Sequence, residues 1–229
     1  MNIKKLNAVN EENIYIFDFD GTLFRCDLLI LYVIYHFFIF GDKIFLIRSL
    51  LSINNKLSTK RKKIFLFFSK KYEMKECFNN FINSYFLKFL IRKKLFNFLK
   101  EVYNKDERIL IMTANYKHLV KSFLHKHNIT EKNTLQIFGT ELPKNNDLLH
   151  KDILKGKQKA AKLLDILKEE NKEFKNITIY NFFDSYDDRF LCEYSNCNVL
   201  VSLSFSKRFF FKKNFNAINY NNYLKDKLL

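Results

Sequence analysis

Five short apolar runs, separated by segments of helical periodicity, constrain the fold of this chain more than any other feature. Apolar runs of this length, bounded by polar residues, predict buried strands. They lie at residues 14–16, 109–112, 135–139, 177–180 and 198–203. Strands that alternate with helices form a parallel sheet with helices on both faces. The pattern therefore predicts an α/β fold with a parallel sheet.

A long helical stretch interrupts this alternation between the first and second predicted strands. Its helices are predicted at residues 28–40, 43–51, 60–71, 75–89 and 92–103. In the last two, apolar residues recur at helical spacing. We expect residues 27–103 to form an all-helical cap, inserted into a core of residues 1–26 and 104–229. Further helices are predicted at residues 118–127 and 157–171.

The first predicted strand runs into the sequence Phe-Asp-Phe-Asp-Gly-Thr, residues 17–22. Residues two apart in a strand project to the same side, so Asp18 and Asp20 are expected to lie close together where Gly21 turns the backbone. Two such carboxylates repel each other unless a cation or a shared proton compensates. A hard divalent cation such as Mg²⁺ is the natural compensation. An ordinary Asp-Gly turn would explain the turn but not both carboxylates.

Two other predicted strands also end in polar groups. Thr113 and Asn115 follow the second strand, and the strand at residues 177–180 leads into the acidic cluster at 184–188. In open α/β sheets, ligands bind beyond the carboxyl ends of the strands. Each feature alone has a structural explanation, since an acidic turn also caps helices. Their coincidence with the first motif favours a site for phosphoryl transfer.

These motifs resemble those of the haloacid dehalogenase (HAD) superfamily, which consists largely of phosphatases and phosphotransferases. The resemblance extends over residues 14–200 and implies a Rossmann-like three-layer core. It assigns Asp18 as the nucleophile that forms an aspartyl-phosphate and Asp20 as the general acid and base. The side chain of Asp18 and the backbone carbonyl of Asp20 would also be ligands of Mg²⁺.

The same resemblance implies phosphate-binding and further metal-binding residues. Thr113 would hydrogen-bond a phosphate oxygen, with Gly21 and Asn115 expected beside it. Asp184 would be a ligand of Mg²⁺, and Asp188 would support the metal directly or through water. The predicted metal site therefore combines carboxylates from the ends of two strands.

Two parts of the pattern leave alternatives open. In the acidic cluster, Asp187 competes with Asp188, and Phe183 stands where the superfamily usually has a small residue. A phosphoryl group also needs a cation, because negative charge spreads over its oxygens. The Gly-x-x-Lys pattern at a predicted helix start favours Lys159, whereas a Lys-Gly-Lys pattern favours Lys157. A basic helix start exposed to solvent is the alternative for at least one of them.

The helical insertion corresponds in position to the cap of the subfamily that contains phosphoserine phosphatase. The pattern is similar to the broad IB group, which includes phosphatidylglycerophosphate phosphatase-like members. The resemblance therefore implies a Mg²⁺-dependent phosphomonoester phosphatase whose substrate is a small-molecule or lipid phosphate. A phosphotransferase or phosphomutase on the same core is the nearer alternative.

A non-catalytic basic protein that binds nucleic acid or anionic membrane is the more distant alternative. The net charge is +16, and residues 207–213 mix basic and aromatic side chains that could stack on bases or lie at an interface. Yet the basic residues are spread along the chain and no recognised nucleic-acid module is present. We therefore do not expect nucleic acid as a partner. The sequence carries no signal for an oligomeric state.

The sequence also bears on location. The apolar run at residues 28–40 is shorter than the roughly 20 residues that a membrane span needs. A buried cap helix is expected, with shallow peripheral attachment to a membrane as the alternative. The polar residues 1–12 contain no apolar core of a signal peptide. The four cysteines show no metal-binding spacing, and cytoplasmic residence is expected.

Overall fold

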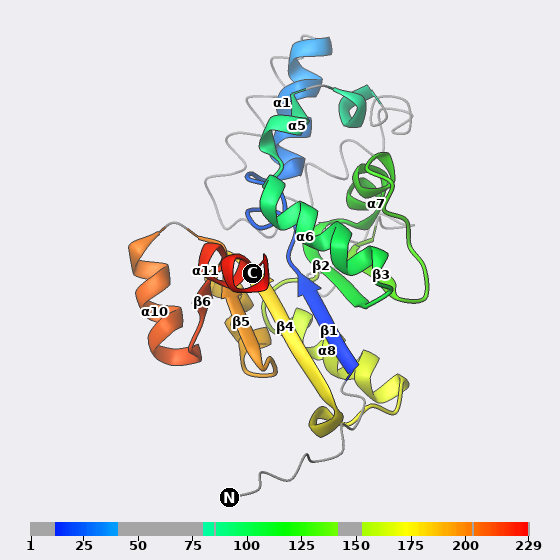
Figure 1. Cartoon of the computed structure of the whole chain (residues 1–229). Helices are drawn as coiled ribbons and strands as arrows, with labels where there is room; N and C mark the ends of the chain where they lie inside the picture. Colours follow the sequence, from blue (N-terminus) through cyan, green and yellow to red (C-terminus); the bar gives the residue numbers. More distant parts are fainter. Residues whose placement is uncertain (1–11, 41–79, 85, 142–152, 203, 229) are drawn as a thin grey trace, which may run out of the picture.

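The computed structural model describes residues 12–40, 80–84, 86–141, 153–202 and 204–228. Within these ranges a six-stranded sheet has the order β3-β2-β1-β4-β5-β6, and every neighbouring pair is parallel (Figure 1). The strands are β1 (Glu12–Phe17), β2 (Arg108–Tyr116), β3 (Leu135–Thr140), β4 (Ile177–Phe183), β5 (Cys197–Leu200) and β6 (Ile218–Asn219). The predicted α/β class with a Rossmann-like parallel sheet is confirmed.

Helices cover both faces of this sheet and make a three-layer core. One face carries α6 (Lys93–Asn104), α7 (Lys117–Lys126) and α11 (Tyr220–Leu228). The other carries α8 (Lys157–Glu169), α9 (Arg189–Cys192) and α10 (Phe205–Phe215). Two short 3₁₀ turns are η2 (Phe174–Asn176) and η3 (Tyr186–Asp188).

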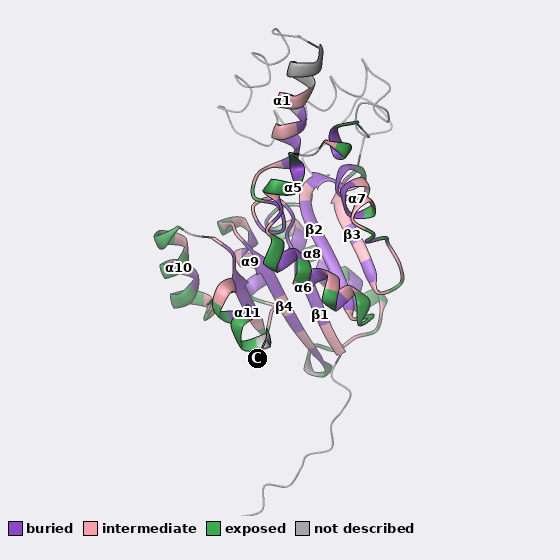
Figure 2. Cartoon of the chain, turned by 45° about the horizontal axis from the view of Figure 1, so that its top comes forward, coloured by how far each residue is buried: buried purple, intermediate pink, exposed green. Residues whose placement is uncertain are grey.

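Strand alternation explains why both layers form. In β1, Tyr15 and Phe17 belong to the cluster on the α6 side, whereas Ile14 and Ile16 belong to the cluster on the α8 side. Successive side chains of a strand point to opposite faces, so a strand buried on both faces is apolar throughout. Figure 2 shows the central strands as mostly buried ribbon.

The described part of the segment expected to form the cap is helical and lies beyond the end of β1 (Figure 1). It comprises α1 (Leu28–Phe40), helical residues 80–83 and α5 (Leu87–Leu90). The prediction of one continuous helix over residues 75–89 was wrong, because the helical residues 80–83 end at Ser84. There the backbone N–H and the hydroxyl of Ser84 both donate to the carbonyl of Phe81, which closes the turn. The helices predicted at 43–51 and 60–71 lie outside the described residues.

Helix α6 packs on the sheet, although its residues were expected to end the cap. Its Phe98 ring lies 6.0 Å from the ring of Tyr15 on β1 and 5.6 Å from that of Phe182 on β4. It also meets Tyr223 of α11 at 5.9 Å. Spacing within α6 predicts a buried face but not which partner covers it. We therefore propose that the cap ends before α6, not at residue 103.

The two chain segments that connect cap and core run side by side. Phe24 and Ile91 form an antiparallel bridge. The N–H of Arg25 donates to the carbonyl of Leu90 at 2.8 Å, and the N–H of Arg92 donates to that of Leu23 at 3.0 Å. This pairing holds together the start and the end of the inserted helical segment, and the first of the two paired segments follows directly after residues 17–22 in the sequence.

The C-terminal part of the chain folds into elements that the sequence analysis left unassigned. The last predicted strand ends at Leu200 instead of residue 203, and α10, β6 and α11 follow. Phe209, Phe210 and Phe211 are consecutive, so α10 has no clear helical periodicity in its apolar residues. The helix is held in place by tertiary packing, because Phe211 is fully buried against Phe183 and Leu200.

Phe123 of α7 provides a test of this packing. Its side chain is 1% exposed, and its ring lies 5.4 Å from that of Phe19 and 5.3 Å from that of Phe24. Phe123→Ala should lower the free energy of unfolding by about 3–5 kcal/mol, because it leaves a cavity beneath the motif. Urea denaturation followed by circular dichroism measures this. Phe174→Ala, at a half-exposed ring, should cost below about 1 kcal/mol; equal losses would contradict the packing.

Candidate active site

The first strand delivers Asp18 and Asp20 to the carboxyl edge of the sheet. The N–H of Asp18 donates to the carbonyl of Phe182 on β4 at 3.0 Å, which extends the strand ladder by one residue. Phe19, between the two aspartates, is fully buried in the aromatic cluster. A tight turn follows, in which the N–H of Phe24 returns to the carbonyl of Phe19 at 3.0 Å. Burial of Phe17 and Phe19 thus turns the intervening Asp18 to the opposite side.

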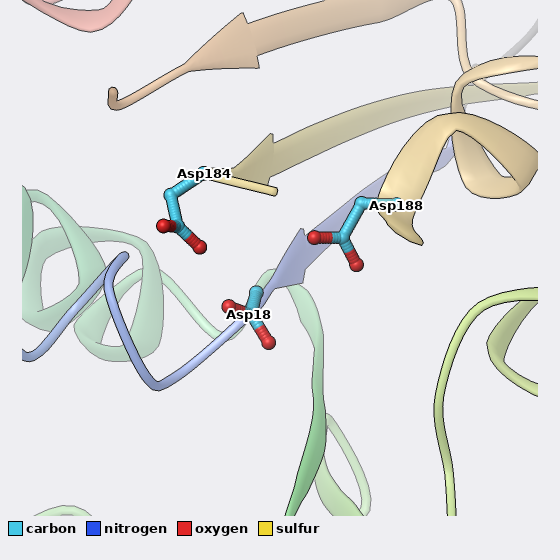
Figure 3. Close-up of side chains that lie close together, drawn as sticks. All are labelled: Asp18, Asp184 and Asp188. Atoms are coloured by element: carbon cyan, nitrogen blue, oxygen red, sulfur yellow. The ribbon is translucent and has the colours of Figure 1, made fainter. Parts of the chain in front are cut away.

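Three carboxylates gather at this edge. Asp18 follows β1, Asp184 follows β4 and Asp188 ends η3, and they point toward one another (Figure 3). One oxygen of each lies within 4.8 Å of the others. Asp18 and Asp188 are buried and Asp184 is half-buried. The ends of two adjacent parallel strands are what bring the cluster together.

A buried lysine holds two of these carboxylates. The Nζ of Lys159 on α8 donates to Asp18 Oδ1 and to Asp188 Oδ1, both at 2.7 Å. The second oxygen of Asp188 accepts a bond from the Ser185 hydroxyl at 2.8 Å. Because both oxygens of Asp188 accept bonds from the protein, we propose that it orients Lys159 and would contact a cation through water.

The other members of the lysine and aspartate runs face away from the cluster. Lys157 is exposed, with its Nζ 5.5 Å from the centre of the Phe190 ring. Lys155 forms a salt bridge of 3.0 Å with the half-exposed Asp187. The structure thus brings Lys159 and Asp188 into the site and leaves Lys157 and Asp187 outside it.

Asp20 lies beside the cluster with its own set of partners. Its carboxylate accepts bonds from Asn115 Nδ2 at 2.9 and 3.2 Å and from the N–H of Leu28 at 2.9 Å. Asn115 was expected to bind phosphate, but its amide nitrogen is engaged by Asp20, so we propose that it positions Asp20. The buried Thr113 accepts the N–H of Asn115 at 3.0 Å. Strand β2 runs on to Tyr116, with an irregular register after Met112, and this bulge presents both polar side chains.

The electrostatics of the cluster favour a bound cation. Burial raises the pKa of Asp18 to about 8, with Asp188 and Asp184 adding to the shift and Lys159 opposing it. Burial also raises the pKa of Asp184 to about 6, against the nearby Lys207. Burial lowers the pKa of Lys159, but Asp18 and Asp188 outweigh it and leave the pKa above its usual value. The raised pKa values show that these carboxylates do not readily ionise at the same time. A hard divalent cation bound between them would favour their charged forms.

Two basic side chains at the site, those of Lys207 and Arg92, were not found by sequence reasoning. Lys207 of α10 donates to the backbone carbonyl of Asp184 at 2.7 Å, and its Nζ lies 3.8 Å from Asp184 Oδ2. Arg92 donates from Nε and from Nη2 to the carbonyl of Gly21, each at 3.2 Å. Neither residue belongs to a recognisable motif. Basic side chains are abundant in this chain, so only the folded structure singles these two out.

Phe183 departs from the expected small residue without disturbing the cluster. Its ring is fully buried on the α10 side of the sheet, 4.7 Å from the ring of Phe211. The next residue, Asp184, still turns into the site. This large side chain is thus accommodated by packing against α10.

The fold and the cluster together define a class of enzymes: α/β proteins whose reacting groups lie at the carboxyl ends of parallel strands. The model of the haloacid dehalogenase-like hydrolases matches residues 15–189. The chain therefore belongs to this family, and the family resemblance found in the sequence motifs is confirmed. A search among curated proteins finds no match.

Solved structures share the fold at low sequence identity. A protein of unknown function from Bordetella pertussis Tohama I matches with a TM-score of 0.58 and 10% identity, over 92% of this chain and 99% of its own. A substrate-bound phosphoserine phosphatase complex matches with a TM-score of 0.54 and 13% identity, over 84% and 87%. A phospho-aspartyl intermediate analogue of phosphoserine phosphatase matches with a TM-score of 0.52 and 14% identity, over the same shares. At these identities the likeness shows the fold.

Gly21 offers a direct test of the cluster, because its φ is +78° and an added Cβ would lie 2.5 Å from Asp184 Cγ. Gly21→Ala should displace the Asp184 carboxylate and reduce the stabilisation that Mg²⁺ confers, which is about 2.7 kcal/mol at 100 times the dissociation constant. Thermal unfolding with and without Mg²⁺ measures it.

Gly156→Ala is the matched control. Its φ is also positive, at +59°, so an alanine there is strained by the backbone as well. However, its nearest neighbours are 3.9 Å from the added carbon. This variant should keep the full Mg²⁺ effect. Equal Mg²⁺ stabilisation in the two variants would argue against Asp184 as a ligand.

Proposed function

We propose that this hydrolase is a Mg²⁺-dependent phosphomonoester phosphatase that acts through an aspartyl-phosphate on Asp18. The observation that carries this proposal is the buried contact of Asp18 with Lys159 beside Asp184. A carboxylate nucleophile needs a cationic surrounding, because both it and the phosphate are negatively charged. Here that surrounding would come from the lysine on one side and a cation on the other.

The cation would be held by the side chains of Asp18 and Asp184 and by the backbone carbonyl of Asp20. When bound, Mg²⁺ would neutralise charge on the phosphoryl oxygens and keep Asp18 ionised. Lys159 would turn its ammonium group from Asp18 toward a phosphoryl oxygen, with Thr113 nearby. We propose that Gly21 contributes to the phosphate-binding loop because it lacks a side chain there.

The proposed reaction has two steps. In the first, an oxygen of Asp18 bonds to phosphorus, the bond from phosphorus to the leaving oxygen breaks, and Asp20 gives that oxygen a proton. In the second, Asp20 takes a proton from water, whose oxygen attacks phosphorus and releases Asp18 and inorganic phosphate. The bonds from Asn115 and Leu28 fix the Asp20 carboxylate beside the site, and because they stabilise its charged form they suit the second step, in which Asp20 takes a proton.

The substrate is proposed to be a small-molecule or lipid phosphate. Phosphoserine phosphatase is among the proteins that share this fold, which supports a phosphate monoester of modest size. The residues Leu28, Leu29 and Tyr32 of α1 are buried in the apolar cluster that also includes residues of β1 and β2. In the part of the chain that the structure describes, no helix is long and apolar enough to cross a membrane.

Asp18→Asn should reduce Mg²⁺-dependent hydrolysis of an aryl phosphate by about 10³-fold or more, because the amide cannot form the phosphoryl bond. The release of the aryl alcohol, followed by absorbance, measures the rate. An unchanged far-ultraviolet circular dichroism spectrum is the control for folding. Undiminished turnover in this variant would overturn the nucleophile assignment. Transfer of phosphate to an added alcohol in preference to water would identify a phosphotransferase instead.

The two lysines near the start of α8 form a matched pair for a second test. Lys159→Met should lower kcat by about 10²–10³-fold, the loss typical when a preorganised charge at the transition state is removed. Lys157→Met should change kcat by less than about twofold, because that side chain is exposed and away from the cluster. The same aryl phosphate assay applies to both. A larger loss in the Lys157 variant would reverse their assignment.

A further inference from the structure

Helix α10 presents a basic and aromatic outer face that neither the fold nor the proposed reaction uses. This outer face consists of Phe205, Arg208, Phe209, Lys212 and Lys213. Phe205 and Phe209 are four residues apart and therefore lie on one side of the helix. The two residues are 78% and 63% exposed, although phenylalanine is a residue type that folded proteins usually bury. Two neighbouring exposed phenylalanines among cations are unusual on a surface that contacts only water.

The inner side of α10 already accounts for its attachment to the protein. Phe211 is fully buried with Phe183 and Leu200, and Phe210 and Phe215 pack around it. Lys207 reaches from the same helix to Asp184. The outer face is therefore not needed to hold α10 in place. Figure 2 shows α10 at the outer edge of the molecule, with much of its surface exposed.

We propose that the outer face of α10 docks the protein on an anionic lipid surface. Phenylalanine rings that enter the interface, flanked by lysine and arginine, are the chemistry of interfacial helices. Charge favours this occupant, because no Asp or Glu occurs between Glu193 and Asp226 and the chain has a net charge of +16. Each basic residue near such a surface strengthens binding by about fivefold.

A cavity beside the outer face provides a place for an anionic headgroup. It has a volume of about 420 Å³ and lies between α10 and the following β6–α11 segment. Arg208 and Lys212 line it together with Asn216, Asn219 and Asn222, and none of the described residues that line it is acidic. Guanidinium, ammonium and amide donors are the groups that bind phosphate oxygens. Rings for the interface and donors for the headgroup thus lie on one edge of the protein.

A lipid surface fits this edge better than nucleic acid. Proteins that bind single strands do so in a groove, where successive bases stack on aromatic rings. Phe205 and Phe209 are instead exposed on a single helix, and α10 lies at the edge of the molecule (Figure 1). A helix is about 10 Å across, so docking through this side would bring Asp184, which Lys207 contacts, close to the membrane surface.

Co-sedimentation of the full chain with vesicles tests the proposal. The protein should bind vesicles of phosphatidylcholine that contain about 30% phosphatidylserine. At roughly 0.1 M salt, its binding to vesicles of neutral phosphatidylcholine should be at least about tenfold weaker. Phe205→Ser combined with Phe209→Ser should lower the partition coefficient about tenfold. Arg208→Gln combined with Lys212→Gln should lower it about 20-fold or more.

Matched controls separate the outer face from general surface chemistry. Phe174→Ser combined with Lys168→Gln removes one exposed ring and one exposed charge elsewhere and should leave vesicle binding unchanged. Hydrolysis of a soluble aryl phosphate should be unchanged in the Phe205/Phe209 variant, which shows that the site is intact and keeps this test independent of the proposed reaction.

Three outcomes would overturn the proposal. One is the absence of binding to anionic vesicles, and another is vesicle binding that the α10 variants do not weaken. The third is a loss of binding to a single-stranded RNA oligonucleotide in these variants without any change in vesicle binding, which would assign the outer face to nucleic acid.

Discussion

The rest of the site depends on the buried ion pairs between the ammonium group of Lys159 and the carboxylates of Asp18 and Asp188. The ammonium nitrogen lies 2.7 Å from both Asp18 and Asp188 in a position almost closed to water. A buried charge is tolerated only when it is paired, and removing one partner leaves the other uncompensated. Without the lysine, carboxylates from β1, β4 and η3 would face one another. Charge therefore joins α8 to the sheet at the same edge where apolar packing brings them together.

Elements outside the cluster of Lys159, Asp18 and Asp188 reach the site through one or two contacts each. Helix α10 does so through Lys207, which holds the segment of Asp184. The cap does so twice, because the N–H of Leu28 binds Asp20 and Arg92 binds the carbonyl of Gly21. The cap and the C-terminal helix are thus both connected to the residues proposed to carry the chemistry. The position of the start of α1 and the orientation of Asp20 are coupled by the bond from Leu28.

Most of the sheet could be predicted because its signals are local. Apolar runs marked β1 to β5 within a few residues, and alternation in the first strand placed Asp18 and Asp20 opposite the buried Phe19. The C-terminal helices could not be predicted in this way. Three consecutive phenylalanines in α10 have no periodicity, and the helix is held by Phe183, which lies more than 20 residues earlier. The packing of Phe98 on the sheet was missed for the same reason, since its partners come from β1, β4 and α11.

By itself the sequence determined the family of this protein, the parallel sheet and the strand ends that carry Asp18 and Asp184. These features follow from patterns within six or so residues, which local backbone geometry converts directly into positions. Only the tertiary structure showed that Lys159 and Asp188 lie in the cluster and that Lys157 and Asp187 lie outside it. The two lysines lie within one helical turn of each other, as do the two aspartates, and each of these pairs has nearly the same local sequence. Burial between β1, β4 and α8 distinguishes them, and burial is a property of distant segments packed together.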